Sequence, residues 1–159
     1  MNNSNGFSQT PLLLQVAEVQ VRYRNKIPYA ERQKVNGSAD AEKIFRANWG
    51  DNMEMVEEFN VLFLTRSNHV KGLFRLSRGG MTGTVADIRV LFATALKGLA
   101  TGLIAAHPHP SGSLQPSSQD IHLTKKLCAV GKIHDIPVLD HLILAPHSGF
   151  YSFADEGML

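Results

Sequence analysis

The sequence predicts an α/β domain in which a mixed sheet is flanked by helices, and three observations support this fold class. Short runs rich in Val, Leu and Phe, such as residues 57–65 and 138–144, are typical of strands. Longer stretches that place an apolar residue every three or four positions are typical of helices. The two kinds of segment alternate along the chain, which favours helices packed against a sheet.

One domain is expected, extending over residues 12–159. A chain of 159 residues buries roughly 70% of the surface that it exposes when unfolded, which is enough for one hydrophobic core. Residues 1–11 are rich in Asn, Ser and Gly. They are predicted to be disordered, because they offer little apolar surface to offset the entropy lost on ordering.

Strands are predicted where apolar residues alternate with polar ones or run together. Residues 17–24 alternate strictly, as expected of a half-buried strand. Residues 57–65 and 70–76 are expected to form a hairpin, ended by Gly79-Gly80. The other strands are expected at 103–106, 138–144 and 151–153.

Three helices are predicted from apolar residues at helical spacing. Ser38 is the expected N-cap of the first, and Gly131 is the expected end of the third, which covers residues 119–130. The second is the most amphipathic segment of the chain. Its apolar positions are Ile88, Leu91, Phe92, Ala95, Leu96 and Leu99, and those of the first helix are Ala41, Ile44, Phe45 and Trp49.

Composition excludes several classes of protein. Apolar residues make up 43% and charged residues 19% of the chain, which excludes a mainly disordered protein. Cys128 is the only cysteine, which excludes an internal disulfide and a cysteine-only zinc site. The first residues lack the apolar run of a signal peptide, and the longest mostly apolar stretch, 99–106, is far below the ~20 residues of a membrane-spanning helix. We therefore expect a cytoplasmic protein without a membrane partner.

The net charge of +2 arises partly from basic residues near the start of the chain. A solvated face explains so small a surplus better than a nucleic-acid footprint, which usually carries more positive charge. Nucleic acid is therefore the less favoured partner. The residues concerned are Arg22, Arg24, Lys26, Arg32 and Lys34.

A proline-flanked pair of histidines follows the strand at 103–106. In an extended segment residues i and i+2 project to the same side, so His107 and His109 can present two imidazoles to one point. Pro108 and Pro110 favour extended conformations at the residues before them, which are the two histidines. The pair alone is weak evidence of a metal site, because two loop histidines also arise by chance.

A third metal ligand is expected shortly after this pair. A catalytic zinc ion typically has three protein ligands and keeps one position for water. Asp120, in the first turn of the helix that follows the glycine-rich and serine-rich loop, is the natural candidate. Ser117-x-x-Asp120 is also the pattern of an N-cap followed by a first-turn acid. The two interpretations are compatible if the carboxylate of Asp120 turns away from the cap.

Taken together these residues resemble a known family. His107-Pro-His-Pro-Ser-Gly112, Pro116-Ser-Ser-Gln-Asp120, Thr124, Asp140-His141 and Tyr151-Ser-Phe153 closely resemble the RadC-like group of JAB/MPN domains, which carry the JAMM metalloprotease motif. The resemblance covers residues 53–159. It implies the JAB/MPN fold, with its cytidine-deaminase-like architecture.

The resemblance also implies roles for individual residues. His107, His109 and Asp120 match the ligands of Zn²⁺, and Ser117 matches the serine that stabilises the oxyanion. The general base of the family is a glutamate that opens an upstream strand. The pattern Glu57-Glu-Phe-Asn-Val-Leu-Phe-Leu64 selects Glu57 for this role, with Glu58 as the fallback.

Two features depart from the family pattern. Pro108 stands between the histidines where RadC-like proteins usually carry Asn, a change that keeps both ligands. No helix-hairpin-helix pattern precedes Glu57, so the residues themselves give no support to the DNA connection of full-length RadC proteins. Asp140 and His141 could orient a metal ligand or form a structural pair, and the sequence favours neither.

The function expected from this resemblance is a zinc-dependent hydrolase, in which zinc-activated water and a glutamate base cleave an amide bond of a peptide or isopeptide. The alternative is a binding module associated with DNA repair or mobile elements, with a structural or vestigial zinc site. A metal-dependent nuclease is less favoured, because nucleases more often use paired metals. The partner expected of the hydrolase is a peptide or protein substrate.

Overall fold

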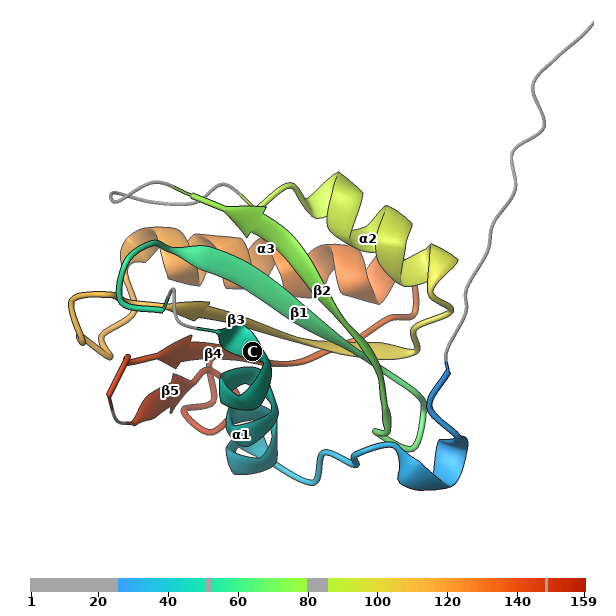
Figure 1. The fold of residues 1–159 in the computed structure, drawn as a ribbon. Helices are drawn as coiled ribbons and strands as arrows, with labels where there is room; N and C mark the ends of the chain where they lie inside the picture. Colours follow the sequence, from blue (N-terminus) through green and yellow to red (C-terminus); the bar gives the residue numbers. More distant parts are fainter. Residues whose placement is uncertain (1–25, 51–52, 80–85, 148) are drawn as a thin grey trace, which may run out of the picture.

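The computed structural model describes residues 26–50, 53–79, 86–147 and 149–159. It confirms the predicted mixed sheet flanked by helices (Figure 1). The strand expected at 17–24 and the disorder expected at 1–11 lie outside the described residues. Within those ranges, no helix combines the length and the apolarity needed to cross a bilayer. The described elements are a 3-10 helix, Tyr29–Glu31, the α-helices α1 Ser38–Trp49, α2 Ile88–Lys97 and α3 Ser118–Ile133, and the strands β1 Glu58–Leu64, β2 Val70–Arg78, β3 Gly102–Pro108, β4 Val138–Leu144 and β5 Phe150–Ser152.

The five strands form one sheet in the order β2-β1-β3-β4-β5. The expected hairpin of β1 and β2 is antiparallel, and β1 also pairs antiparallel with β3. β3 and β4 are parallel, whereas β5 returns antiparallel to β4. Because two parallel neighbours cannot be joined by a tight turn, the chain crosses over between β3 and β4 through α3.

Helices cover both faces of the sheet, with α2 and α3 on one side and α1 on the other (Figure 1). Alternate residues of β1 and β3 therefore enter two separate cores. Phe59 and Ala105 pack into the core beneath α2 and α3, whereas Leu62 and Ile104 pack into the core beneath α1. Every residue of β1 and β3 is buried, as expected of interior strands covered on both faces.

Pro108 is accommodated at the end of β3 because of the way the neighbouring ladders end. The N–H groups of Leu103 and His109 donate to carbonyls of the β4 side, so the odd-numbered residues of this strand pair towards β4. The register of β3 with β1 ends at Ala106, opposite Asn60, so position 108 lies beyond that ladder. A proline at position 108 therefore removes no N–H that β1 would have used.

Two helix termini differ from those predicted. The N-cap of α1 is Gly37, and Ser38 is the first helical residue, whose hydroxyl donates to Asp155 Oδ2 at 2.5 Å instead of capping the helix. Helix α2 ends at Lys97, where the chain turns towards β3. Leu99 adopts a left-handed conformation with φ 50° and is 65% exposed, so it is not part of the apolar face.

Gly131 does not end α3, which continues to Ile133 with His134 as its C-cap. The glycine is needed for a different reason. A Cβ at this position would lie 2.6 Å from the carbonyl oxygen of Ile136, in the segment that leads into β4. Since that oxygen belongs to the backbone, only the smallest residue allows α3 to pack this closely against the chain that follows it.

We expect Gly131→Ala to lower the free energy of unfolding by about 1 to 3 kcal/mol, through the clash with Ile136. The sign is diagnostic, because Gly→Ala in an unobstructed helix interior stabilises by roughly 1 kcal/mol. Gly72→Ala, on strand β2, is the control for a methyl group added in open space, since a Cβ there meets nothing within 4 Å. Chemical denaturation measures both, and a stabilised Gly131→Ala variant would contradict the close packing.

Candidate metal centre

Two histidines at the end of β3 face the first turn of α3. His107 follows Leu103 and Ala105 on the face of β3 that points to α3, and His109 follows at the next alternate position. The two Nε2 atoms lie 3.1 Å apart. The histidine pair and Asp120 together place one ligand atom each within 4.8 Å of one another. The structure therefore brings together the three side chains predicted to bind zinc.

Asp120 contacts both rings while it also caps α3. Its Oδ1 lies 3.1 Å from His107 Nε2, and its Oδ2 lies 3.5 Å from His109 Nε2. Oδ2 also accepts a hydrogen bond from the backbone N–H of Ser117, and Ser117 Oγ accepts one from the N–H of Asp120. This reciprocal capping box fixes the carboxylate. The expectation that the carboxylate must turn away from the cap to meet the histidines is wrong.

The charges of the three side chains support one another. Burial acts to raise the pKa of Asp120, but hydrogen bonds with His107 and His109 outweigh it and hold that pKa far below its usual value. The hydrogen bond with Asp120 raises the pKa of His109, against the opposing effect of burial. The carboxylate therefore carries its full negative charge between the two rings, which favours a cation at this point.

Each imidazole has a second partner on its far side. His109 Nδ1 lies 2.8 Å from the carbonyl oxygen of Ser113, in the loop before α3. His107 Nδ1 lies 2.9 Å from Nε2 of His141, which is fully buried on β4. His141 Nδ1 in turn lies 2.7 Å from the hydroxyl of Thr124, one helical turn after Asp120.

Aromatic side chains enclose the inner part of the cluster. Phe59 from β1 stacks on His107, with ring centroids 6.1 Å apart, and tilts against His141 at 5.4 Å. Phe153 stacks on His141 at 5.0 Å. Burial lowers the pKa of His141 well below its usual value, and repulsion from His107 acts in the same direction, which favours the neutral ring.

The two candidate glutamates occupy different environments. Glu57 precedes β1 and is half-buried, and its negative charge contributes to the raised pKa of His109. Glu58 is 7% exposed and forms an ion pair with Arg78, its partner in the hairpin register, at 3.2 Å. Glu57 is thus the glutamate whose charge acts on His109, whereas Glu58 forms an ion pair with the neighbouring strand.

Asp140 and His141 act separately although they are adjacent in the sequence. The Asp140 carboxylate accepts hydrogen bonds from the N–H groups of His141 and Ala154 and from the hydroxyl of Ser152. It ties β4 to the C-terminal segment, and burial raises its pKa. Only His141 reaches the metal-ligand cluster. Sequence reasoning assigned no role to Thr124 or Ser113, because neither has a residue-type signal of its own.

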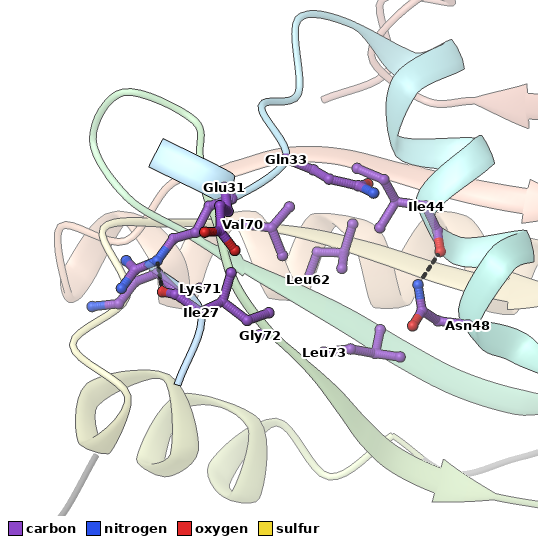
Figure 2. A pocket seen from close by; sticks show the side chains of 11 residues that line it. Ile27, Glu31, Gln33, Ile44, Asn48, Leu62, Val70, Lys71, Gly72 and Leu73 are labelled. Atoms are coloured by element: carbon purple, nitrogen blue, oxygen red, sulfur yellow. Dashed lines mark hydrogen bonds between the residues drawn. The ribbon is translucent and has the colours of Figure 1, made fainter. Parts of the chain in front are cut away.

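A cavity of about 280 Å³ lies away from this centre, between the segment 27–33, α1 and β2 (Figure 2). Ile44 and Leu62 line it, and both belong to the core beneath α1, whereas His107 faces α3. Asn48 at its rim donates to the carbonyl of Ile44 within the same helix (Figure 2). The cavity therefore contributes nothing to the histidine cluster.

Comparison with known proteins adds a family to this geometry. Residues 35–158 match the family model described as RadC-like JAB domain. A UPF0758 protein of Flavobacterium johnsoniae is 45% identical over 126 residues, covering 79% of this chain and 54% of that protein. A UPF0758 protein of Porphyromonas gingivalis is 42% identical over 103 residues, covering 65% and 45%. One of Salinibacter ruber is 34% identical over 129 residues, covering 81% and 54%. The chain thus spans about half the length of these curated relatives.

We expect added Zn²⁺ to stabilise the protein. A free concentration 100 times the Kd raises the unfolding free energy by about 2.7 kcal/mol, which corresponds to a Tm higher by roughly 5 to 10 °C for a chain of this size. His109→Ala should abolish this shift. It is preferred to an Asp120 variant because Asp120 also caps α3.

His122→Ala is the control, since His122 is an exposed histidine of the same helix. Thermal melts with and without Zn²⁺, together with metal analysis of the purified variants, give the measurement. A His109→Ala protein that gains as much Tm as the parent would refute the ligand set.

Proposed function

The chain belongs to the RadC-like JAB domain family, and from that premise we propose that it is a zinc-dependent hydrolase that cleaves amide bonds in peptides or isopeptides. The observation that carries the proposal is the convergence of His107, His109 and Asp120, whose ligand atoms lie within 4.8 Å of one another. The relatives are named only as UPF0758 proteins, a name that states no activity.

The donor set fits a catalytic zinc ion. Two imidazole nitrogens and one carboxylate oxygen are the three-ligand complement that leaves a coordination position free, and no thiol is involved. When bound, zinc supplies Lewis acidity, which lowers the pKa of a water molecule to about 7 and polarises a carbonyl group. The three residues hold the ion, and the remaining tasks fall to other side chains.

Glu57 is the proposed general base. It accepts a proton from the attacking water and later gives it to the departing amine, which is the transfer that amide cleavage requires. Its half-buried position next to β1 keeps it within electrostatic reach of His109. Glu58 is unsuited to the task, because its carboxylate is buried and paired with Arg78.

Ser117 is the proposed oxyanion donor. Its oxygen accepts the N–H of Asp120 at 3.1 Å, so its own hydrogen remains available to donate. The residue is exposed at the start of α3, next to the metal ligands. A hydroxyl fixed in this way can stabilise the negative charge that develops on the carbonyl oxygen of the substrate.

A second candidate function is a nucleic-acid-binding module in which hydrolysis has no part. It is favoured by the exposed surface of α3, on which no acidic residue occurs between positions 121 and 134. Binding to a short DNA duplex with an affinity that falls steeply as salt is added would support this function, and the absence of binding at low salt would exclude it. The exposed basic side chains of this surface are those of His122, Lys125, Lys126 and Lys132.

We expect Glu57→Gln to lower turnover by roughly 10²- to 10⁴-fold while zinc content stays unchanged, because the amide cannot accept a proton. The measurement is hydrolysis by the zinc-loaded protein of a substrate identified in a screen of peptides and isopeptides. Glu58→Gln is the matched control and should lose little activity. A Glu57→Gln protein as active as the parent, or an equal loss in Glu58→Gln, would exclude Glu57 as the base.

A further inference from the structure

We propose that the groove between α2 and α3 is a docking surface for an acidic, amphipathic helical segment of another protein. The two helices cover the same face of the sheet (Figure 1), and between them lies a hollow of about 700 Å³. None of the predicted metal ligands lines it, so docking there does not require the proposed hydrolase activity. The residues that form this α2–α3 groove are chiefly Ile88, Phe92 and Leu96 on α2, and Lys126, Val130 and His134 on α3.

The shape of the groove suits a helix. Its residues follow one another at intervals of four on each of the two helices, so they form one row along α2 and one along α3. Each row is about 12 Å long, at a rise of 1.5 Å per residue. The ring of Phe92 stacks on that of His134, with centroids 5.5 Å apart, which places the two rows side by side. A third helix can pack its side chains between two such rows over about two turns.

The floor and the α2 side of the groove are apolar. Phe92 is buried at the base, and Val130 faces it from α3 as a half-buried side chain. Leu96 is 47% exposed at the edge, and Ala93 is exposed beside it. A concave apolar surface with an aromatic residue at its base is typical of the grooves that receive the apolar face of an amphipathic helix.

The charge around the groove is positive. Asp87 is the one acidic residue among the described residues that line it, and its carboxylate is occupied by Arg89, which donates to Oδ2 at 2.7 Å. Lys126 is exposed and takes part in none of the ion pairs of the described residues. Between positions 88 and 134 Asp120 is the only acidic residue. The cations of this stretch are Arg89, Lys97, Lys125, Lys126 and Lys132. An acidic partner is complementary to this charge.

The segments of this chain that adjoin the described residues lack the matching charge. Residues 80–85, which precede α2, contain no acidic side chain. Residues 1–25 contain Glu18 as their only acidic residue, against the two cations Arg22 and Arg24. Neither segment is therefore an acidic amphipathic helix, and the occupant that fits is a segment of another protein.

Nucleic acid fits the groove less well than such a segment. Phosphates are bound by several cations on one surface and gain little from apolar walls. Lys125 and Lys132 are seven residues apart and share a flank of α3 that is not the flank of Lys126. An acidic amphipathic helix uses both features of the groove, because its apolar residues contact the floor while its carboxylates contact Lys126.

The test measures the binding of two fluorescent synthetic peptides to the full chain by anisotropy. Both peptides have about 18 residues, or roughly five helical turns, with leucine at every third or fourth position. One has glutamate and alanine at the other positions, and its counterpart has lysine and alanine. We expect saturable binding of the glutamate peptide that weakens with salt, and binding of the lysine peptide at least about 10-fold weaker. A parent protein that does not bind the glutamate peptide would overturn the proposal.

Substitutions on α3 locate the bound peptide by its charge. We expect Lys126→Glu to lower the affinity for the glutamate peptide about 10-fold and to raise that for the lysine peptide. Lys125→Glu is the matched control, because it makes the same change of charge at an exposed position on a different flank of the helix. Equal losses in the two variants would mean that the peptide responds to the general charge of the protein and not to the groove, which rejects the proposal.

Substitutions on α2 test the apolar contact. Leu96→Ser should lower the affinity about 5- to 10-fold, the effect of losing roughly half the burial of a leucine. Val90→Ser is its control, since Val90 is 46% exposed on the same helix but does not line the groove. An unchanged affinity in Leu96→Ser would contradict docking in the groove. The lysine pair decides the question alone if Leu96→Ser does not fold.

Two other occupants are distinguished in the same experiments. A DNA duplex that binds more tightly than the glutamate peptide, and loses that affinity in Lys126→Glu, would assign the groove to nucleic acid instead. A dimer in sedimentation experiments that Leu96→Ser dissociates would assign it to a second copy of the chain. Either result replaces the proposed occupant. Since every readout is binding and none is turnover, a protein without hydrolase activity leaves these outcomes unchanged.

Discussion

The parallel pairing of β3 with β4 places the three predicted metal ligands and the side chains of His141 and Thr124 behind them. Its register sets Ala105 opposite His141, which brings the His141 ring beside that of His107, two residues further along β3. A parallel pair also requires a crossover, and α3 supplies it. The helix starts directly after the histidine loop, so its first two turns return Asp120 and Thr124 to the strand ends that the chain has just left. One topological requirement thus assembles residues from three elements.

Such a cluster would be costly if its polar atoms lacked partners. A buried polar group without a hydrogen bond costs roughly 1 to 3 kcal/mol, and three imidazoles and a carboxylate contain many such groups. Here each of these four side chains has partners on both sides. The two nitrogens of His107 contact His141 on one side and the other predicted ligands on the other. Asp140 is satisfied by three donors of its own, on the far side of β4.

Sequence reasoning reached those parts of the molecule that depend on local spacing. The hairpin of β1 and β2 follows from two runs rich in Phe, Val and Leu, and the amphipathic character of α2 follows from a period of 3.6 residues. The projection of His107 and His109 to one side follows from the period of two of an extended chain. The fold class followed from the alternation of such segments. The prediction that Gly131 ends a helix is wrong. It relied on a local pattern, a glycine after apolar residues, whereas the glycine is required by a close approach to Ile136 that exists only in the folded chain.

Other features depend on the register between segments that are far apart in the sequence, and this register cannot be inferred from one sequence. The choice between Glu57 and Glu58 turns on the pairing of Glu58 with Arg78 across the hairpin. The link between Thr124 and His141 depends on an irregularity in the β3–β4 ladder. One step along β3, from Leu103 to Ile104, corresponds there to two steps along β4, from Val138 to Asp140. Alternation along β4 then separates Asp140 from His141, a pair that sequence adjacency presents as one unit.

The two histidines of the pair are oriented by unlike means. The ring of His109 contacts the backbone carbonyl of Ser113, which is retained whatever side chain stands at that position. The ring of His107 contacts the side chain of His141, which in turn contacts Thr124, and a single substitution can remove either contact. A related protein that had lost one of these side chains would still carry the His-x-His pair and the Asp. A search for those three residues alone would therefore count its centre as intact.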